Sequence, residues 1–131
     1  MKKRTMTLII ILCILLLTGL AGNILLTVTT ENLEKLRDIP LQTLELSATE
    51  DGVYTGSFTR FPLEVEVEVV VTEQRIVSIE LLKHRNGQGE AAETIPSVVV
   101  REQSLQVDSV SGATYSSIVI LKAIENALSG K

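Results

Sequence analysis

The chain has 131 residues, enough for one small domain and too few for a multidomain enzyme, since domains usually take ~100–200 residues. Three of its 12 basic residues precede residue 29, so residues 29–131 contain 9 basic and 16 acidic side chains and carry a net charge of −7. An acidic body does not neutralise a phosphodiester backbone, which argues against nucleic acid as a partner. The single cysteine, Cys13, excludes an intramolecular disulfide, and a single histidine argues against a zinc site.

The amino-terminal part of the chain is apolar, and residues 7–28 contain no charge over 22 positions. A helix of this length would measure about 33 Å at ~1.5 Å per residue, which is enough to cross a ~30 Å hydrocarbon core. A Lys-Lys-Arg sequence at residues 2–4 precedes the segment, and Glu31 follows it. The positive-inside bias then predicts a single-pass protein of the cell membrane with its carboxy-terminal part on the extracytosolic side. Residues 1–28 are therefore expected to be a basic tip and a transmembrane signal anchor.

A cleavable signal peptide is the alternative for this segment. Its densest apolar run, residues 8–17, has ten residues, and Gly19-Leu20-Ala21 is an acceptable small-residue cleavage site. Apolar residues resume at positions 24–28, which favours the uncleaved anchor.

Residues 29–49 connect the apolar segment to the rest of the chain. Leu33 and Leu36 have helical spacing and precede Pro40. This pattern predicts a short juxtamembrane helix followed by a tether.

Three strands are predicted in the next part of the chain. Residues 54–60 are rich in threonine and aromatic residues, and residues 63–71 alternate valine with glutamate, as is typical of a strand with one face in water. A turn at residues 72–74 leads to a third strand at residues 75–82. The order predicts an antiparallel meander.

Helices are predicted in the last third of the chain. Residues 83–89, KHRNGQG, have the composition of a flexible loop. Residues 90–95 have a helical pattern and Pro96 suits the first turn of a second helix, whereas residues 97–103 fit either a helix or a strand. A final helix ending at Gly130 is predicted to pack its apolar side on the sheet. Its expected polar face consists of Lys122, Glu125, Asn126 and Ser129.

The predicted fold class is α+β, with a small antiparallel sheet packed by two or three helices and preceded by one transmembrane helix. The globular domain is expected to occupy residues 50–131.

Residues 107–117, VDSVSGATYSS, form a hydroxyl-rich turn that leads into the final helix. The first backbone N–H groups of a helix are unpaired and lie at its positive end, so this position suits a phosphate. Serine and threonine are also preferred helix caps, and Gly-Ala permits a tight turn. The residues alone leave both interpretations open.

The motif resembles a known one. Ser-Gly-Ala-Thr at residues 111–114, with Asp108 before it and two serines after it, is similar to the flavin-attachment motif of the bacterial FMN-binding domain family. Members of that family include the C subunit of the sodium-pumping NADH:quinone oxidoreductase and the G subunit of the Rnf complex. Asp-Gly-Val-Tyr-Thr-Gly at residues 51–56 resembles the opening of the same domain, and the resemblance covers roughly residues 50–128.

The resemblance implies that FMN is bound through its phosphate to the hydroxyl of Thr114. It also implies a flavin transferase outside the cytoplasm that attaches the group from FAD and recognises Asp108. The tyrosines Tyr54 and Tyr115 are candidates for stacking on the flavin ring, with core packing as the alternative, and His84 is a candidate for contacting the ring or a redox partner. The cofactor-binding residues predicted in this way are Thr114, Asp108, Ser111, Gly112, Ala113, Tyr115, Ser116, Ser117 and His84.

No separate catalytic acid, base or nucleophile stands out, so the resemblance implies an electron-transfer protein more than an independent enzyme. It would accept electrons from a membrane quinol or dehydrogenase and pass them to an external or partner acceptor. Two alternatives are non-covalent FMN binding, with Thr114 as a cap and phosphate ligand, and a membrane-anchored binding module without a redox role. A hydrolase is a weaker interpretation, because Ser111 or Ser116 would need a base and His84 is the sole histidine.

Overall fold

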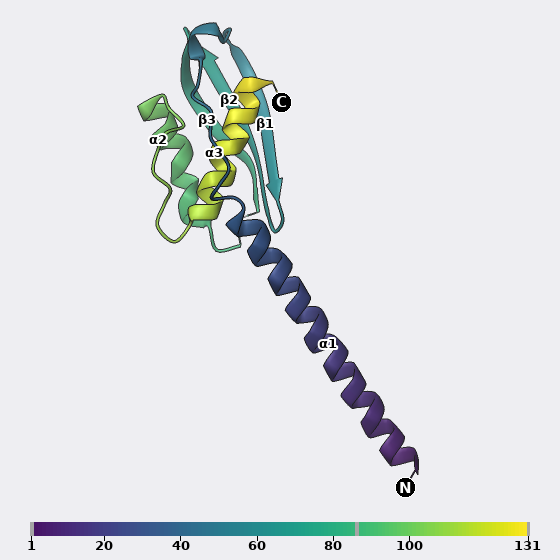
Figure 1. The fold of residues 1–131 in the computed structure, drawn as a ribbon. Coiled ribbons are helices and arrows are strands. Elements are labelled where there is room, and N and C mark those ends of the chain that lie inside the picture. The colour runs from purple at the N-terminus through teal and green to yellow at the C-terminus, as the bar shows by residue number, and fades with distance from the viewer. Residues whose placement is uncertain (1, 86, 131) are drawn as a thin grey trace. The chain divides into compact units, whose positions relative to one another are not determined.

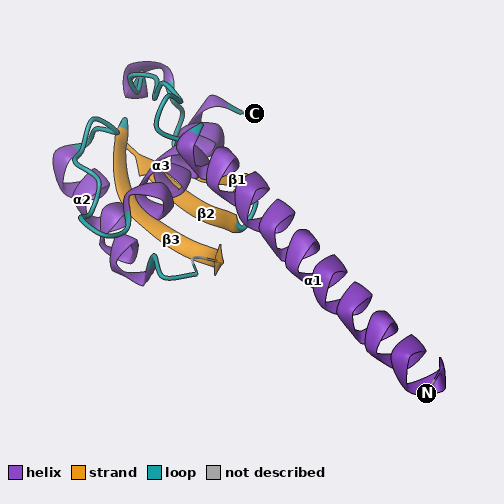
Figure 2. Ribbon diagram, turned by 60° about the horizontal axis from the view of Figure 1, so that its bottom comes forward, coloured by secondary structure: helices purple, strands orange, loops and turns teal. Residues whose placement is uncertain are grey.

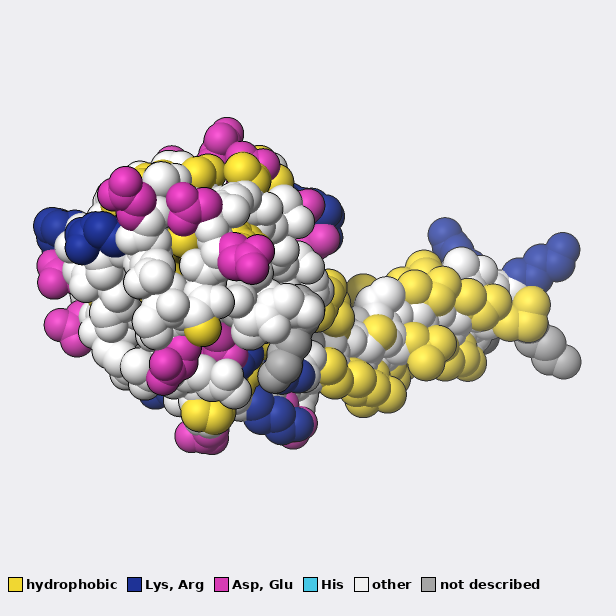
Figure 3. Space-filling view, turned by 90° about the horizontal axis from the view of Figure 1, so that it is seen from above, with side chains coloured by type: hydrophobic (Ala, Val, Ile, Leu, Met, Phe, Trp, Pro, Cys, Tyr) yellow, Lys and Arg dark blue, Asp and Glu magenta, His cyan; other side chains and the backbone are white. Residues whose placement is uncertain are grey.

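A computed structural model describes residues 2–85 and 87–130, and its chain divides into two compact units, Met1–Asn32 and Leu33–Lys131. The described residues of the first unit belong to helix α1, Lys2–Glu34, which is long and apolar enough to cross a membrane (Figure 1). Its large hydrophobic side chains are exposed, and Figure 3 shows hydrophobic side chains along the visible length of the helix. The structure therefore contains the apolar helix predicted for residues 7–28.

Helix α1 continues through Leu33 to Glu34 and Leu36 lies in the turn that follows, so the separate juxtamembrane helix predicted around these two leucines does not form. That prediction was wrong, because no glycine or proline stands between residues 23 and 39 to interrupt α1. The chain leaves the helix through three successive i→i+3 backbone hydrogen bonds, donated by the amides of Leu36, Arg37 and Ile39.

The second unit is built on a three-stranded sheet in the order β1-β2-β3 (Figures 1 and 2). The strands are β1 Gly52–Arg60, β2 Leu63–Thr72 and β3 Arg75–Arg85, and both pairs are antiparallel. The predicted meander is confirmed. In β2 the valines at positions 65, 67, 69 and 71 are buried, while the alternating side chains are exposed or half-buried. One face of the sheet thus forms the core and the other is in contact with water.

The helices of this unit pack on the core face. Helix α3, Thr114–Ser129, contacts β1 and β2, and α2, Ile95–Glu102, contacts β3. Residues 97–103, which fit either a helix or a strand, continue α2 to Glu102. The preceding segment is a 3₁₀ helix, η2 Glu90–Thr94, and a second short 3₁₀ helix, η1, covers Leu46–Ala48. Gly130 ends α3 in a left-handed conformation, as expected.

The flexible loop predicted at residues 83–89 was wrong in its first half. Strand β3 continues to Arg85, and His84 is paired with Val65 of β2. Strand β3 continues to Arg85 because this polar segment pairs with the buried strand β2. The sequence Lys-His-Arg alone has no strand pattern, so the end of β3 could not be predicted from it. Residue 86 lies outside the described residues.

Gly56 determines how closely α3 approaches the sheet. A Cβ atom at this position would lie within 3.0 Å of the backbone of Ala123 and Ala127. Asn126 of α3 also donates a hydrogen bond to the carbonyl oxygen of Ser57, at 2.9 Å. The absence of a side chain at residue 56 therefore allows backbone-to-backbone packing of the helix on β1.

The segment between α1 and β1 packs on the same unit. Leu36 is fully buried, and Leu33, Ile39, Leu41, Leu44 and Leu46 pack against the core. The amide of Gln42 donates to Glu125 at 3.1 Å, and Glu125 also accepts a hydrogen bond from Lys122 at 2.6 Å. The prediction that Glu125 lies on a solvent-facing side of the last helix was wrong, since only 3% of it is exposed. The segment that covers this carboxylate belongs to residues 29–49, for which the sequence predicted a tether.

Candidate functional site

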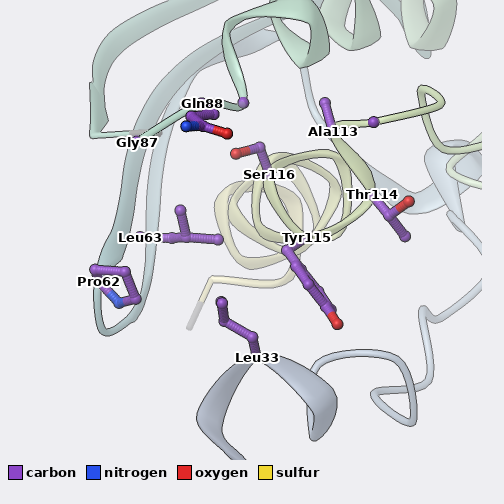
Figure 4. Close-up of a pocket in the computed structure, with 11 residues that line it drawn as sticks. Leu33, Pro62, Leu63, Gly87, Gln88, Ala113, Thr114, Tyr115 and Ser116 are labelled. Carbon is purple, nitrogen blue, oxygen red and sulfur yellow. The ribbon is translucent and has the colours of Figure 1, made fainter. Parts of the chain in front are cut away.

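A cavity of about 290 Å³ lies at the amino-terminal end of α3 (Figure 4). Its wall comes from four separate parts of the second unit: the last turn of α1, the β1–β2 turn, the loop after β3, and the start of α3. The residues that line it are Leu33, Pro62, Leu63, Gly87, Gln88, Gly89, Gly112, Ala113, Thr114, Tyr115 and Ser116. Five of the nine cofactor-binding residues predicted from the sequence are among them, from Gly112 to Ser116.

The turn before α3 has a fixed shape. The amide of Ala113 donates to the carbonyl oxygen of Val110 at 2.9 Å, and Gly112 has a φ of 78°. A positive φ at the third residue of a four-residue turn is that of a type II turn, which favours glycine there. The buried hydroxyl of Ser117 donates to the carbonyl of Ala113 at 2.8 Å and accepts the amide of Val110 at 3.0 Å. Ser117 thus connects the turn to the first turn of the helix.

The first residues of α3 line the cavity and have hydrogen-bonding groups without a partner among the described residues. Ala113 is in the N-cap position and cannot cap the helix with its side chain. Within the described part of the chain, the amides of Thr114, Tyr115 and Ser116 have no backbone or side-chain acceptor. The hydroxyls of Thr114 and Ser116 likewise make no hydrogen bond to a described residue, and both residues line the cavity. Three unpaired amides and two hydroxyls at the positive end of a helix suit an anion such as a phosphate.

Tyr115 is held by residues at the end of α1. Its hydroxyl donates to Oε1 of Glu34 at 2.6 Å, and the guanidinium carbon of Arg37 lies 5.4 Å from the centre of its ring. The hydrogen bond to Glu34 raises the pKa of Tyr115, because ionisation of the phenol would remove the donated proton. Figure 4 shows the Tyr115 ring extending from the helix beside Leu33.

Four of the predicted cofactor-binding residues lie outside the cavity lining. Ser111 is exposed in the turn, Ser117 is buried behind it, and Asp108 is exposed on the preceding loop, next to a different hollow that also includes Arg101. His84 is on β3, where its side chain is 5% exposed and its Nδ1 lies 2.8 Å from Oε1 of Glu93. The second candidate for ring stacking, Tyr54, donates instead to the carbonyl of Glu50 and is not a cavity residue.

Several cavity residues were not predicted from the sequence. Leu33 and Leu63 have apolar side chains typical of any core, and Pro62 resembles an ordinary turn residue. The glycines of the Gly87-Gln88-Gly89 segment were the available signal, because glycine-rich loops permit close approach of a ligand. The sequence identified them only as parts of a flexible loop.

Comparison with known proteins identifies the domain to which this site belongs. The model of the FMN-binding domain family matches residues 62–129, about half of the chain, and this match includes the motif and most of the cavity. A urocanate reductase of Eggerthella lenta is 33% identical over 78 residues, which represent 57% of this chain and 13% of that protein. An NADH:acrylate oxidoreductase of Vibrio harveyi is 27% identical over 101 residues, or 75% of this chain and 10% of that protein. The chain thus spans only a small part of the length of these relatives.

Proposed function

The chain belongs to the FMN-binding domain family, and from this premise we propose that it is a membrane-anchored, extracytosolic electron carrier with FMN attached through a phosphoester to Thr114. The cofactor is FMN, as the family match establishes. The covalent bond, the membrane anchor and the redox partners are what the proposal adds to the family membership. The observation that supports it most strongly is that Thr114 lines the cavity at the start of α3 and that its hydroxyl has no hydrogen-bond partner among the described residues.

The residues present fit the phosphate end of FMN. The unpaired amides of Thr114, Tyr115 and Ser116 would bind the phosphate oxygens, and the Ser116 hydroxyl is a further donor. The cavity volume of about 290 Å³ lies just below the ~300–1,000 Å³ typical of ligand sites. In attachment from FAD, the Thr114 oxygen would form a bond to the FMN phosphorus as the bond to AMP breaks, and AMP would leave with the hydroxyl proton.

The protein residues would hold and orient the cofactor, while bound FMN supplies one- and two-electron transfer. Both relatives have reductase or oxidoreductase names, which supports a redox role for the domain. A covalent bond would keep FMN on an exported protein whatever the concentration of free flavin. Helix α1 would hold the domain at the membrane, next to a membrane quinol or dehydrogenase as electron donor.

The proposal is tested by the mass of the full chain produced in cells that have an extracytosolic flavin transferase. Trypsin cleaves after Arg101 and Lys122 and releases residues 102–122, which contain Thr114. We expect this peptide to gain the mass of FMN less one water and to retain flavin fluorescence after denaturation. Fragmentation of the peptide should locate the added mass at Thr114, and Thr114→Val should abolish it, because valine has a similar shape and no hydroxyl.

Two further variants complete this test. Ser78→Ala removes an exposed hydroxyl on β3, outside the motif and the cavity lining, and should leave attachment unchanged. Asp108→Ala should lower the flavinylated fraction if the exposed carboxylate is recognised by the transferase. Bound FMN that is released on denaturation would contradict the covalent bond and favour non-covalent binding. A purified chain without flavin, despite the transferase, would favour a binding module.

A further inference from the structure

The end of α1 contributes to the wall of the flavin cavity, although it is far from the motif in the sequence. Leu33 lines the cavity, and Glu34 is in contact with Tyr115, the residue that follows Thr114. Nε of Arg37 lies 3.9 Å from Oε2 of Glu34. The side chains of Glu34, Arg37 and Tyr115 therefore form one group, called here the Tyr115 cluster.

The backbone of this segment is fixed independently of the cluster. Leu36, between the two charged residues, is fully buried in the core. Further along the segment, the amide of Gln42 is bound to the buried Glu125, and the side chain of Gln106 donates to the carbonyl of Leu41 at 3.4 Å. The cluster residues Glu34 and Arg37 are therefore presented to Tyr115 from an anchored segment.

The cluster itself contributes little to stability. The side chains of Glu34 and Arg37 are 64% and 59% exposed, and exposed ion pairs have small effects on the free energy of unfolding. The main effect of the cluster is on the orientation of Tyr115. A tyrosine ring that is bound at its hydroxyl and covered by a guanidinium has little rotational freedom. Tyr115 is also the aromatic residue that lines the cavity.

We propose that Glu34 and Arg37 are positioning residues that hold Tyr115 as a wall of the flavin site and thereby shield the bound cofactor from solvent. The inference rests on the proposed function. It makes the segment between the membrane helix and the sheet a part of the cofactor site, in addition to its connecting role.

The first experiment tests the cluster without flavin. In a Tyr54→Phe background Tyr115 is the only tyrosine and the chain has no tryptophan, so phenolate absorbance reports its ionisation alone. We expect Glu34→Ala to lower the pKa of Tyr115 and Arg37→Ala to raise it further, since the carboxylate opposes ionisation and the guanidinium favours it. Glu31→Ala, an exposed glutamate one turn earlier on α1, is the matched control and should have no effect. Equal titration curves for all four chains would overturn the inference.

The second experiment measures quenching of flavin fluorescence by iodide in the full, flavinylated chain. Glu34→Ala and Tyr115→Phe should both raise the quenching constant, because each removes the hydrogen bond that holds the ring. Glu34→Gln keeps an oxygen acceptor for the hydroxyl and should restore the wild-type constant, a rescue that loss of charge alone does not explain. Unchanged quenching in Glu34→Ala would overturn the inference.

The two proposals can be separated. Absence of covalent FMN from the wild-type chain would contradict the attachment at Thr114 only, and the same quenching comparison would then use FMN added to the purified chain. A chain that does not bind added FMN would overturn both proposals.

Discussion

The two halves of helix α3 differ in what surrounds them. Around the carboxy-terminal half, Gly56 allows the backbone of Ala123 and Ala127 to pack directly on β1, and Glu125 is covered by the segment before the sheet. At the amino-terminal end, Thr114 and Ser116 line a cavity with amides and hydroxyls that have no partner among the described residues. The same helix thus has a closely packed half and an end whose first polar groups have no partner among the described residues.

This difference suggests a division of roles along one element. Close backbone packing tolerates no added atom, so substitutions in the packed half should act on the free energy of unfolding. The polar groups of Thr114 and Ser116 have no partner to lose among the described residues, so substitutions at these two positions should act on the cofactor and not on the free energy of unfolding. The helix can hold a phosphate at its start because the rest of its length is fixed by the sheet.

The largest effect is expected from Gly56→Ala. The added Cβ would meet backbone atoms on α3, which cannot rotate away, so the helix must shift from the sheet. We expect the free energy of unfolding to fall by roughly 3 kcal/mol or more, at the upper end for overpacked sites. Chemical denaturation of the full chain in detergent, followed by circular dichroism of the sheet and α3, measures this change.

Two variants serve as controls for Gly56→Ala. Gly52→Ala lies on the same face of β1, but the atoms nearest to its Cβ would be those of the Tyr54 side chain, at 3.5 Å or more, so its effect should be within about 0.5 kcal/mol. Adding Ala127→Gly to Gly56→Ala should not restore stability, because the close atoms of Ala127 are its backbone N and Cα. Restoration in the double variant would show that the packing is between side chains.

A second prediction compares neighbouring serines at the open end. Ser117→Ala removes the buried hydroxyl that binds both Val110 and Ala113, and should lower the free energy of unfolding by about 1–3 kcal/mol. Ser116→Ala removes the hydroxyl of a cavity residue without a partner among the described residues, so it should leave stability unchanged and lower the flavinylated fraction. Thermal unfolding and the flavinylated fraction, measured on both variants, distinguish the two roles. If Ser117→Ala changed only flavin content, its structural role would be wrong.

The α+β class and the meander could be predicted from the sequence because they follow from local pattern. The alternation of valine and glutamate in β2 directly indicates that one face of this strand is in contact with water. His84 and Glu125 were misplaced for the opposite reason. Each is a polar residue whose burial depends on a partner far away in the chain, Val65 for His84 and Gln42 for Glu125. Local polarity cannot reveal such partners.

The site could be predicted only in part, because some of its residues form a local motif and others come from distant segments. The residues from Gly112 to Ser116 are contiguous, and their motif is a local signal that the cavity includes. Leu33 and Pro62 reach the same cavity from distant segments, through the end of α1 and the β1–β2 turn. Nothing in a leucine or a proline by itself indicates a ligand, so the opposite wall of the site becomes evident only from the fold.

The smallest effect is expected on the outer face of the sheet, which packs against neither half of α3. There Lys83 donates a hydrogen bond to Glu64 at 2.8 Å, and this bond lowers the pKa of Glu64. A lowered pKa contributes stability above the ordinary value near 4.5, and this contribution is lost as the pH falls through the lowered value. Lys83→Gln should therefore raise the pKa of Glu64 toward 4.5 without a measurable change in flavin content or in stability at neutral pH. Carbon-detected NMR titration of the Glu64 carboxylate measures the shift. A change in flavin content in this variant would mean that the outer face communicates with the cavity, and the division between the two halves of α3 would then be incomplete.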